Sequence, residues 1–393
     1  MTETYATGTG DDLVAVASAM RPALAARAEL CERERRLPEE TVKELLDSGL
    51  FHMRVPRALG GLGCDERTKA RVTAETAKAC PSTAWVLNIL AGTTAAATAG
   101  LPEEGVAEIF AGAHPPLVCG VNALGGTATR VPGGYRVDGS WGFASGCLHA
   151  GWAVMGVRFT DGAADASTGI VCMPMSELSV NDTWHVAGMR GTGSNTVVAK
   201  EVHVPERLAV PVPDGIAPAL QRSPLAPAFS ALLLGPLLGA TESMLETVAA
   251  GLDRRRVTYF SYARQSDSHV VLNALGDAAM LIDTAWLHTD RVLADIDAEA
   301  ATGPMDMHTS ARGQADSAHA VRALRRAAAL LMGIAGASAY AESNPLQRAW
   351  RDLEAGSHHA MLNTPHSLEL YGRVLAGAEP NSPLWGPEAT LFA

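Results

Sequence analysis

The chain of 393 residues carries a formal net charge of −11, and 47% of its residues are hydrophobic. It can therefore bury a large core, and its negative charge argues against nucleic-acid binding, which needs clustered cations. The six cysteines are dispersed without a Cys-x-x-Cys pair, the first residues do not resemble a signal peptide, and no apolar run approaches the roughly 18 residues of a membrane span. We expect a cytoplasmic protein without a metal site, a disulfide framework or a membrane segment.

Residues 1–115 are predicted to form an N-terminal helical domain. Alanine, leucine and glutamate dominate this part of the chain, and Pro38-Glu39-Glu40 is typical of a helix start. The stretch from Val55 to Gly63 holds residues that cannot continue a helix, so we expect a loop there.

Residues 116–213 are predicted to form a central antiparallel β-domain. Short β-branched and aromatic runs alternate here with Gly, Asp and Asn, and Pro132-Gly133-Gly134 indicates a hairpin turn. The predicted strands are 127–131, 134–138, 152–159, 169–173 and 196–204.

Residues 214–393 are predicted to form a helical bundle, because apolar residues recur there at helical spacing. A fourth helix is expected after Leu346. The three apolar stripes are Leu238, Leu245, Val248 and Leu252; Leu275, Ala279, Ile282 and Trp286; and Val321, Leu324, Ala328 and Leu331. The fold class is thus mainly α with a central β-domain.

Two segments of the β-domain are candidates for ligand binding, although no Rossmann or P-loop motif is present. In the segment from Gly188 to Asn195, glycines around Thr192 would let backbone amides approach a ligand closely. In the segment from Gly139 to Cys147, strand alternation would place Trp141, Phe143 and Ser145 on one face, against a flat ring. The alternative is that both are ordinary strand connections.

The C-terminal region supplies candidate proton-transfer residues. On a helix begun near Pro345, Asp352 and His359 would lie two turns apart on one face, and Arg351 and His358 likewise. A buried histidine near a phenol or amine can act as a general base. The alternative is that these histidines are structural. The basic run Arg254 to Arg256 fits either a solvated helix face or an anionic ligand.

Together these segments resemble the acyl-CoA dehydrogenase superfamily, in its branch of two-component monooxygenases that use reduced flavin. The matching pieces arrive in the family's order along nearly the whole chain. They include Arg36 to Glu40, Ser82 to Trp85, Gly133 to Gly146, Gly188 to Ser194, Val204 to Glu206, and Pro345 to His359. The resemblance implies an N-terminal helical domain, a β-barrel-like domain and a four-helix bundle that forms the core of a homotetramer.

The resemblance also implies which residues contact the flavin, FAD or FMN, between the β-domain and the bundle. An arginine from a neighbouring subunit often binds the flavin phosphates, and the candidates are Arg254 to Arg256 and Arg264. The other expected contacts are Trp85, Asn122, Trp141, Phe143, Ala144, Ser145, Arg190, Thr192, Gly193 and Ser194.

The chemistry implied is oxygenation rather than dehydrogenation, because no Tyr-Glu-Gly type motif supplies a carboxylate base and His359 matches a monooxygenase residue. Similar enzymes receive reduced flavin from a separate reductase by diffusive transfer and react it with dioxygen to give a flavin hydroperoxide. Ser145 is the expected hydrogen-bond donor at the reactive nitrogen, and His359, with His358 as fallback, the expected base.

The expected substrate is a small aromatic or natural-product compound hydroxylated at carbon. The alternatives are nitrogen oxidation of an amino sugar or other amine, sulfur oxidation, an acyl-CoA dehydrogenase, and a non-catalytic scaffold protein.

Overall fold

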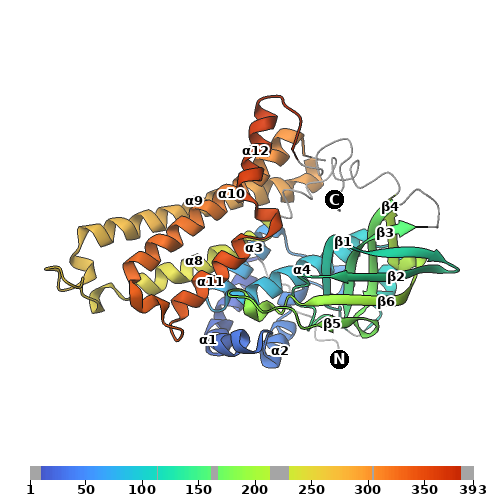
Figure 1. Cartoon of the computed structure of the whole chain (residues 1–393), viewed down its shortest axis with the longest axis horizontal. Helices are drawn as coiled ribbons and strands as arrows, with labels where there is room; N and C mark the ends of the chain where they lie inside the picture. The colour runs from blue at the N-terminus through green and yellow to red at the C-terminus, as the bar shows by residue number, and fades with distance from the viewer. Residues whose placement is uncertain (1–9, 113, 161–166, 213–229, 303–304, 382–393) are drawn as a thin grey trace.

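The computed structural model describes residues 10–112, 114–160, 167–212, 230–302 and 305–381 (Figure 1). Helices α3 and α4 lie at the centre of the molecule, where α3 packs on bundle helix α8 and α4 packs on the first strand. The helices before the sheet are α1 (Gly10–Glu34), α2 (Glu39–Asp47), α3 (Glu66–Ala77), α4 (Pro81–Gly100) and α5 (Glu103–Ile109).

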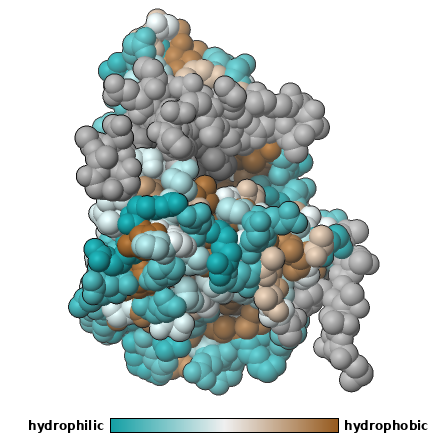
Figure 2. All heavy atoms as spheres, turned by 90° about the vertical axis from the view of Figure 1, so that its right-hand side faces the viewer, coloured by the Kyte–Doolittle hydropathy of each residue, from teal (hydrophilic) through white to brown (hydrophobic). Residues whose placement is uncertain are grey.

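A seven-stranded sheet follows, and it contains all five predicted strands. Its order is β5-β6-β2-β1-β3-β4-β7, and seen from the sheet end the surface is mainly hydrophilic with small apolar patches (Figure 2). The strands are β1 (Val118–Val131), β2 (Gly134–Trp141), β3 (Trp152–Thr160), β4 (Ser167–Pro174), β5 (Ser179–Asn181), β6 (Thr196–Pro205) and β7 (Ala209–Val212).

The sheet is mixed, so the prediction of a purely antiparallel domain was wrong at one pairing. Strands β1 and β2 form the predicted hairpin, with Gly133 at a φ of 78° in the turn. The chain then crosses back through residues 142–151, and Trp152 pairs with Val118 at the start of β1. Strand β3 therefore runs parallel to β1. This crossing segment carries Phe143, Ala144 and Ser145.

The C-terminal helices form an elongated bundle on the side of α3 opposite the sheet (Figure 1). The apolar stripe predicted around Leu324 is buried on α10, whereas the stripe on α9 is only partly buried. Helix α9 leaves Val270, Met280 and Leu287 exposed. The helices are α8 (Leu234–Ala249), α9 (His269–Thr302), α10 (Met307–Ala335), α11 (Pro345–Ser357) and α12 (Thr364–Leu375).

Two glycines one helical turn apart allow α8 to lie directly against α3. A Cβ added to Gly239 would come within 1.8 Å of the Ala74 carbonyl oxygen, and one added to Gly235 within 2.2 Å of the Thr73 hydroxyl oxygen. Because these contacts are so short, only glycine fits at either position. The bundle is thus joined to the N-terminal helices by a close helix crossing.

One buried carboxylate joins α11, α4 and the loop before β6. Asp352 of α11 accepts the backbone N–H of Met189 at 2.6 Å and the hydroxyl of Ser82 on α4 at 3.1 Å. Burial raises the pKa of Asp352 to about 6, because it disfavours the charged carboxylate more than these two donors and Arg351 stabilise it. Asp352 therefore holds together the three parts of the chain that surround the candidate site.

We expect Gly239→Ala to destabilise the protein by about 1–3 kcal/mol or more, because the added methyl group must push α8 away from the α3 backbone. Urea unfolding followed by circular dichroism measures this loss. The matched control is Gly372→Ala in α12, where an added Cβ meets no heavy atom within 4 Å and alanine favours the helix. Equal unfolding midpoints for the two variants would contradict the close crossing.

A second prediction concerns the ionisation of Asp352. Its pKa of about 6 in the folded protein lies above the ordinary aspartate value of 3.8, so the folded state holds the proton more tightly than the unfolded state. The free energy of unfolding should therefore fall as pH rises from about 4 to 6, by at most ~3 kcal/mol. Asp352→Asn removes this titration. The stability difference between wild type and variant should change across that interval, and a constant difference would disprove the assignment.

Candidate active site

A chain of three buried hydroxyl groups lies between the sheet and α4. The Ser145 Oγ is 2.7 Å from the Ser194 Oγ, which is 2.7 Å from the Thr192 Oγ1. Thr192 donates to the Met189 carbonyl oxygen at 2.9 Å, and the Trp85 indole N–H donates to Ser145 at 3.3 Å. The structure thus brings four of the predicted residues, Trp85, Ser145, Thr192 and Ser194, into one network.

The loop that holds Thr192 and Ser194 follows the neighbouring helices closely. Met189 and Gly193 adopt left-handed φ values of 54° and 53°. Gly191 has no room for a side chain, because an added Cβ would lie 2.3 Å from the Cys31 sulfur. Arg190 folds back and donates to the carbonyl oxygens of Glu32 at 3.4 Å and Val186 at 3.2 Å. Its guanidinium therefore helps to fix the loop.

The predicted common face of Trp141, Phe143 and Ser145 does not exist, because β2 ends at Trp141. Trp141 is 1% exposed, and its indole N–H donates to the Gly156 carbonyl oxygen at 2.8 Å. Phe143 has a left-handed φ of 62° that breaks the alternation, and it is 77% exposed. Trp141 is a core residue of the sheet, whereas the Phe143 ring is exposed to solvent. Ala144, between Phe143 and Ser145, is buried.

Trp184 belongs to the site although it was not predicted from the sequence. Its ring packs edge-on against Phe143 at a centroid distance of 5.7 Å, and its N–H donates to the Met189 carbonyl oxygen at 2.9 Å. Asn195 accepts the backbone N–H groups of Thr183 and Trp184, each at 3.0 Å. A tryptophan in a polar strand connection was the available signal, but only the fold places it beside Phe143.

His358 and His359 do not continue the helix, so the predicted alignment of His359 with Asp352 was wrong. Helix α11 ends at Ser357, and His358 points its Nδ1 at the Glu354 carbonyl oxygen, 2.7 Å away. His359 instead precedes a 3-10 turn (Ala360–Leu362) and caps it, because its Nδ1 accepts the Met361 N–H at 3.2 Å. Arg351 forms an ion pair with Glu32 at 2.5 Å.

The His359 ring lies 5.9 Å from the Trp85 ring, measured between centroids. The His359 side chain is exposed on one side. The protein atoms on its other sides desolvate the ring, and this desolvation lowers the pKa of His359. The imidazole is therefore neutral at pH 7. Since Nδ1 accepts a hydrogen bond, the ring proton resides on Nε2. His359 thus presents an N–H donor on the ring edge opposite the cap.

Two of the predicted flavin contacts lie apart from this network. Asn122 is exposed on β1, next to an irregularity in the β1–β3 pairing. Arg264 forms an ion pair with Asp267 at 2.7 Å in the loop between α8 and α9, at the end of the bundle remote from the sheet (Figure 1). Arg254 and Arg255 in this loop donate to the Ala250 and Ala335 carbonyl oxygens. The loop cannot reach the site of its own chain.

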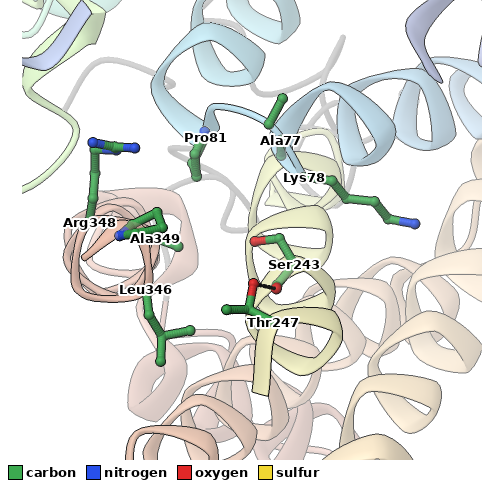
Figure 3. A pocket seen from close by; sticks show the side chains of 10 residues that line it. Ala77, Lys78, Pro81, Ser243, Thr247, Leu346, Arg348 and Ala349 are labelled. Atoms are coloured by element: carbon green, nitrogen blue, oxygen red, sulfur yellow. Dashed lines mark hydrogen bonds between the residues drawn. The ribbon is translucent and has the colours of Figure 1, made fainter. Parts of the chain in front are cut away.

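A small cavity of about 70 Å³ lies where α3, α8 and α11 meet (Figure 3). Lys78 points its ammonium group away from it and forms ion pairs with Glu242 at 3.0 Å and Glu75 at 3.2 Å. The volume of the cavity suits one or two water molecules rather than a three-ring cofactor.

Among the residues that the structure describes, no cluster of three or more His, Cys, Asp or Glu side chains could hold a metal ion.

The residues around Ser145 fit a flavin. A flat heteroaromatic ring needs an accessible aromatic surface, which the exposed Phe143 and the partly buried Trp184 supply, and a hydrogen-bonding group at its edge, which Ser145 supplies.

Comparison with known proteins agrees with this fit. The models of the acyl-CoA dehydrogenase N-terminal and C-terminal domains match residues 14–104 and 231–364. The oxygenase subunit HsaA of a flavin-dependent monooxygenase from Mycobacterium tuberculosis is 30% identical, over 91% of this chain and 94% of HsaA. The oxygenase component of an FADH2-dependent resorcinol hydroxylase from Rhizobium is 31% identical, over 89% of this chain and 90% of that protein.

A solved structure gives the same result. XiaF from Streptomyces, in complex with FADH2 and glycerol, superposes with a TM-score of 0.90 at 33% identity, over 95% of this chain and 97% of XiaF. These relatives confirm the fold class, the reduced-flavin cofactor and the oxygenase chemistry expected from the sequence. The chain belongs to the acyl-CoA dehydrogenase superfamily, in its branch of flavin-dependent monooxygenases that serve as the oxygenase component of two-component systems.

Proposed function

We propose that this monooxygenase hydroxylates a small phenolic substrate at a site bounded by Ser145, Trp85 and His359. The observation that carries the proposal is that Trp85 contacts both of the other residues: its N–H donates to Ser145, and its ring lies against His359. The expected flavin contact and the expected substrate contact therefore flank one indole. The similarity to a resorcinol hydroxylase supports a phenol as substrate.

Reduced flavin would be held by Phe143 and Trp184 at its face and by Ser145 at its edge. When bound, it supplies the two electrons with which dioxygen delivers one oxygen atom to the substrate and the other to water. Thr192 and Ser194 are buried behind Ser145. Their hydroxyls are hydrogen-bonded to each other, to Ser145 and to the Met189 carbonyl oxygen, so this wall of the site needs no water to complete its hydrogen bonds.

His359 would contact the substrate oxygen. Its Nε2–H can donate to a phenol or phenolate oxygen and favour the electron-rich phenolate, which is the better nucleophile. To remove a proton through Nε2 instead, the ring would first have to move its own proton to Nδ1 and give up the bond from Met361. The geometry thus supports a donor role for His359 more directly than the base role expected from the sequence.

We further propose a cytoplasmic homotetramer that receives flavin from its reductase by diffusion. The six cysteines are unpaired, as in proteins of reducing compartments. Helix α9 is long and apolar enough to cross a membrane by length and composition alone. It nevertheless packs along α10, and its exposed apolar face, with Phe260 in the preceding loop, suits other copies of the chain. Such packing would also bring Arg264 near a neighbouring site.

Ser145→Ala should lower the yield of product per reduced flavin, because the flavin edge loses its hydrogen-bond partner and the buried Ser194 hydroxyl loses its neighbour. We expect the fraction of reducing equivalents released as hydrogen peroxide to rise several-fold. Product and peroxide measured together after single-turnover mixing would test this. If the amount of product formed per reduced flavin is unchanged, Ser145 does not belong to the flavin site.

His359→Ala should slow product formation by about 10- to 100-fold while the dissociation constant for reduced flavin stays within about twofold. His359→Asn separates the two roles of the residue, because asparagine can still cap the 3-10 turn but is too short to replace Nε2. The matched control is His358→Ala, next in the chain but bound to Glu354, for which we expect near wild-type turnover. Equal turnover in all three variants would contradict the role of His359.

A further inference from the structure

We propose that the hydroxyl chain behind Ser145 has a fixed direction, which makes Ser145 a hydrogen-bond acceptor toward the flavin and lets the site favour reduced over oxidised flavin. Thr192 and Ser194 then act as positioning residues. The inference rests on the proposed contact between Ser145 and the flavin edge, and it assigns a role to residues that do not touch the flavin themselves.

The direction follows from the number of protons available. A hydroxyl group has one proton to donate, and a backbone carbonyl has none. Thr192 uses its hydroxyl proton in a hydrogen bond to the Met189 carbonyl oxygen at 2.9 Å. The 2.7 Å bond between Thr192 and Ser194 therefore needs the proton of Ser194, and the 2.7 Å bond between Ser194 and Ser145 needs the proton of Ser145.

Trp85 fixes the other end of the chain. An indole N–H only donates, so the 3.3 Å bond from Trp85 occupies one lone pair of the Ser145 oxygen. The proton of Ser145 points back to Ser194. What Ser145 retains for a ligand is its second lone pair, so in this arrangement it accepts a hydrogen bond. From the sequence, Ser145 was expected to act in the opposite way, as a hydrogen-bond donor.

The Met189 carbonyl is held where it enforces this direction. It also accepts the Trp184 indole N–H at 2.9 Å, and the Met189 N–H is bound by the Asp352 carboxylate at 2.6 Å. Thr192 and Ser194 are 1% and 4% exposed, so water has little access to them. Reversing the chain would turn the proton of Thr192 away from Met189, which forfeits one buried hydrogen bond, a factor of roughly three to ten in population.

The two redox states of a flavin differ at the group that Ser145 would meet. The ring nitrogen N5 carries a proton in the reduced state and only a lone pair in the oxidised state. An acceptor at Ser145 can bond to the reduced form directly, whereas the oxidised form would face it lone pair to lone pair. The fixed direction therefore favours retention of the reduced cofactor and release of the oxidised product.

The test compares Thr192→Val with Thr192→Ser. Valine matches threonine in shape but offers Ser194 no acceptor, so the chain can reverse and Ser145 can donate. We expect the ratio of the dissociation constants for oxidised and reduced flavin to fall about three- to tenfold. Serine keeps the hydroxyl, and its ratio should stay within about twofold of wild type. Both constants come from fluorescence titration of the apoprotein, anaerobically for reduced flavin.

A second variant tests the same inference if the first does not fold. Ser194→Ala removes the acceptor of the Ser145 proton directly and should lower the same ratio by a similar factor. A wild-type ratio in folded Thr192→Val and Ser194→Ala proteins would overturn the inference, although the Ser145 contact would still stand if Ser145→Ala changes the flavin affinities. If Ser145→Ala leaves both affinities and the product yield unchanged, the contact itself is wrong.

Discussion

The carboxylate of Asp352 lies where helix α11, helix α4 and the loop before β6 meet, and the candidate site depends on it. Its two oxygens accept hydrogen bonds from Met189 and Ser82, which belong to different parts of the fold. Charging this group inside the protein is unfavourable, as its raised pKa shows. Its two donors are what keep a carboxylate tolerable at this position, so the three segments are held together strongly.

The contacts of Asp352 continue into the chemistry of the site. The Met189 N–H donates a hydrogen bond to Asp352, and the Met189 carbonyl oxygen accepts hydrogen bonds from the Thr192 hydroxyl and the Trp184 indole. Through Thr192 the constraint reaches Ser145, and through Trp184 it reaches Phe143. The face and the edge of the proposed flavin site thus share one backbone group, and Asp352 fixes the position of that group.

Much of this architecture could be predicted from local patterns. The strand runs, the hairpin at Gly133 and the apolar stripes each follow from periodicity and turn chemistry within a few residues. The end of α11 could not be predicted from local patterns, because it depends on tertiary contacts. A Cβ at Gly356 would lie 2.8 Å from Leu237 and 3.2 Å from Trp85, so the last turn of α11 packs closely against both residues, and the helix ends one residue later at Ser357. His359 consequently left the helix face on which sequence spacing had placed it.

Similar reasons explain the other differences between prediction and structure. Whether β3 runs parallel to β1 depends on the path of residues 142–151, which no periodicity reports. The separation of Trp141 from Phe143 depends on one left-handed residue at the strand end. Gly235 and Gly239 are visible in the sequence, but their partners on α3 are not. Ser145, Thr192 and Ser194 could be predicted as site residues, but the direction of their hydrogen bonds depends on how the fold brings them together with Met189 and Trp85.

The exposed apolar face of α9 also bears on how the protein is made in the cell. In a single chain Val270, Met280 and Leu287 are in contact with water, and the proposed tetramer would cover them. In the proposed tetramer, the lifetime of a fresh subunit therefore depends on how soon it meets another. At low expression such subunits would be substrates for chaperones and proteases, so abundance itself would help to decide how much active oxygenase accumulates.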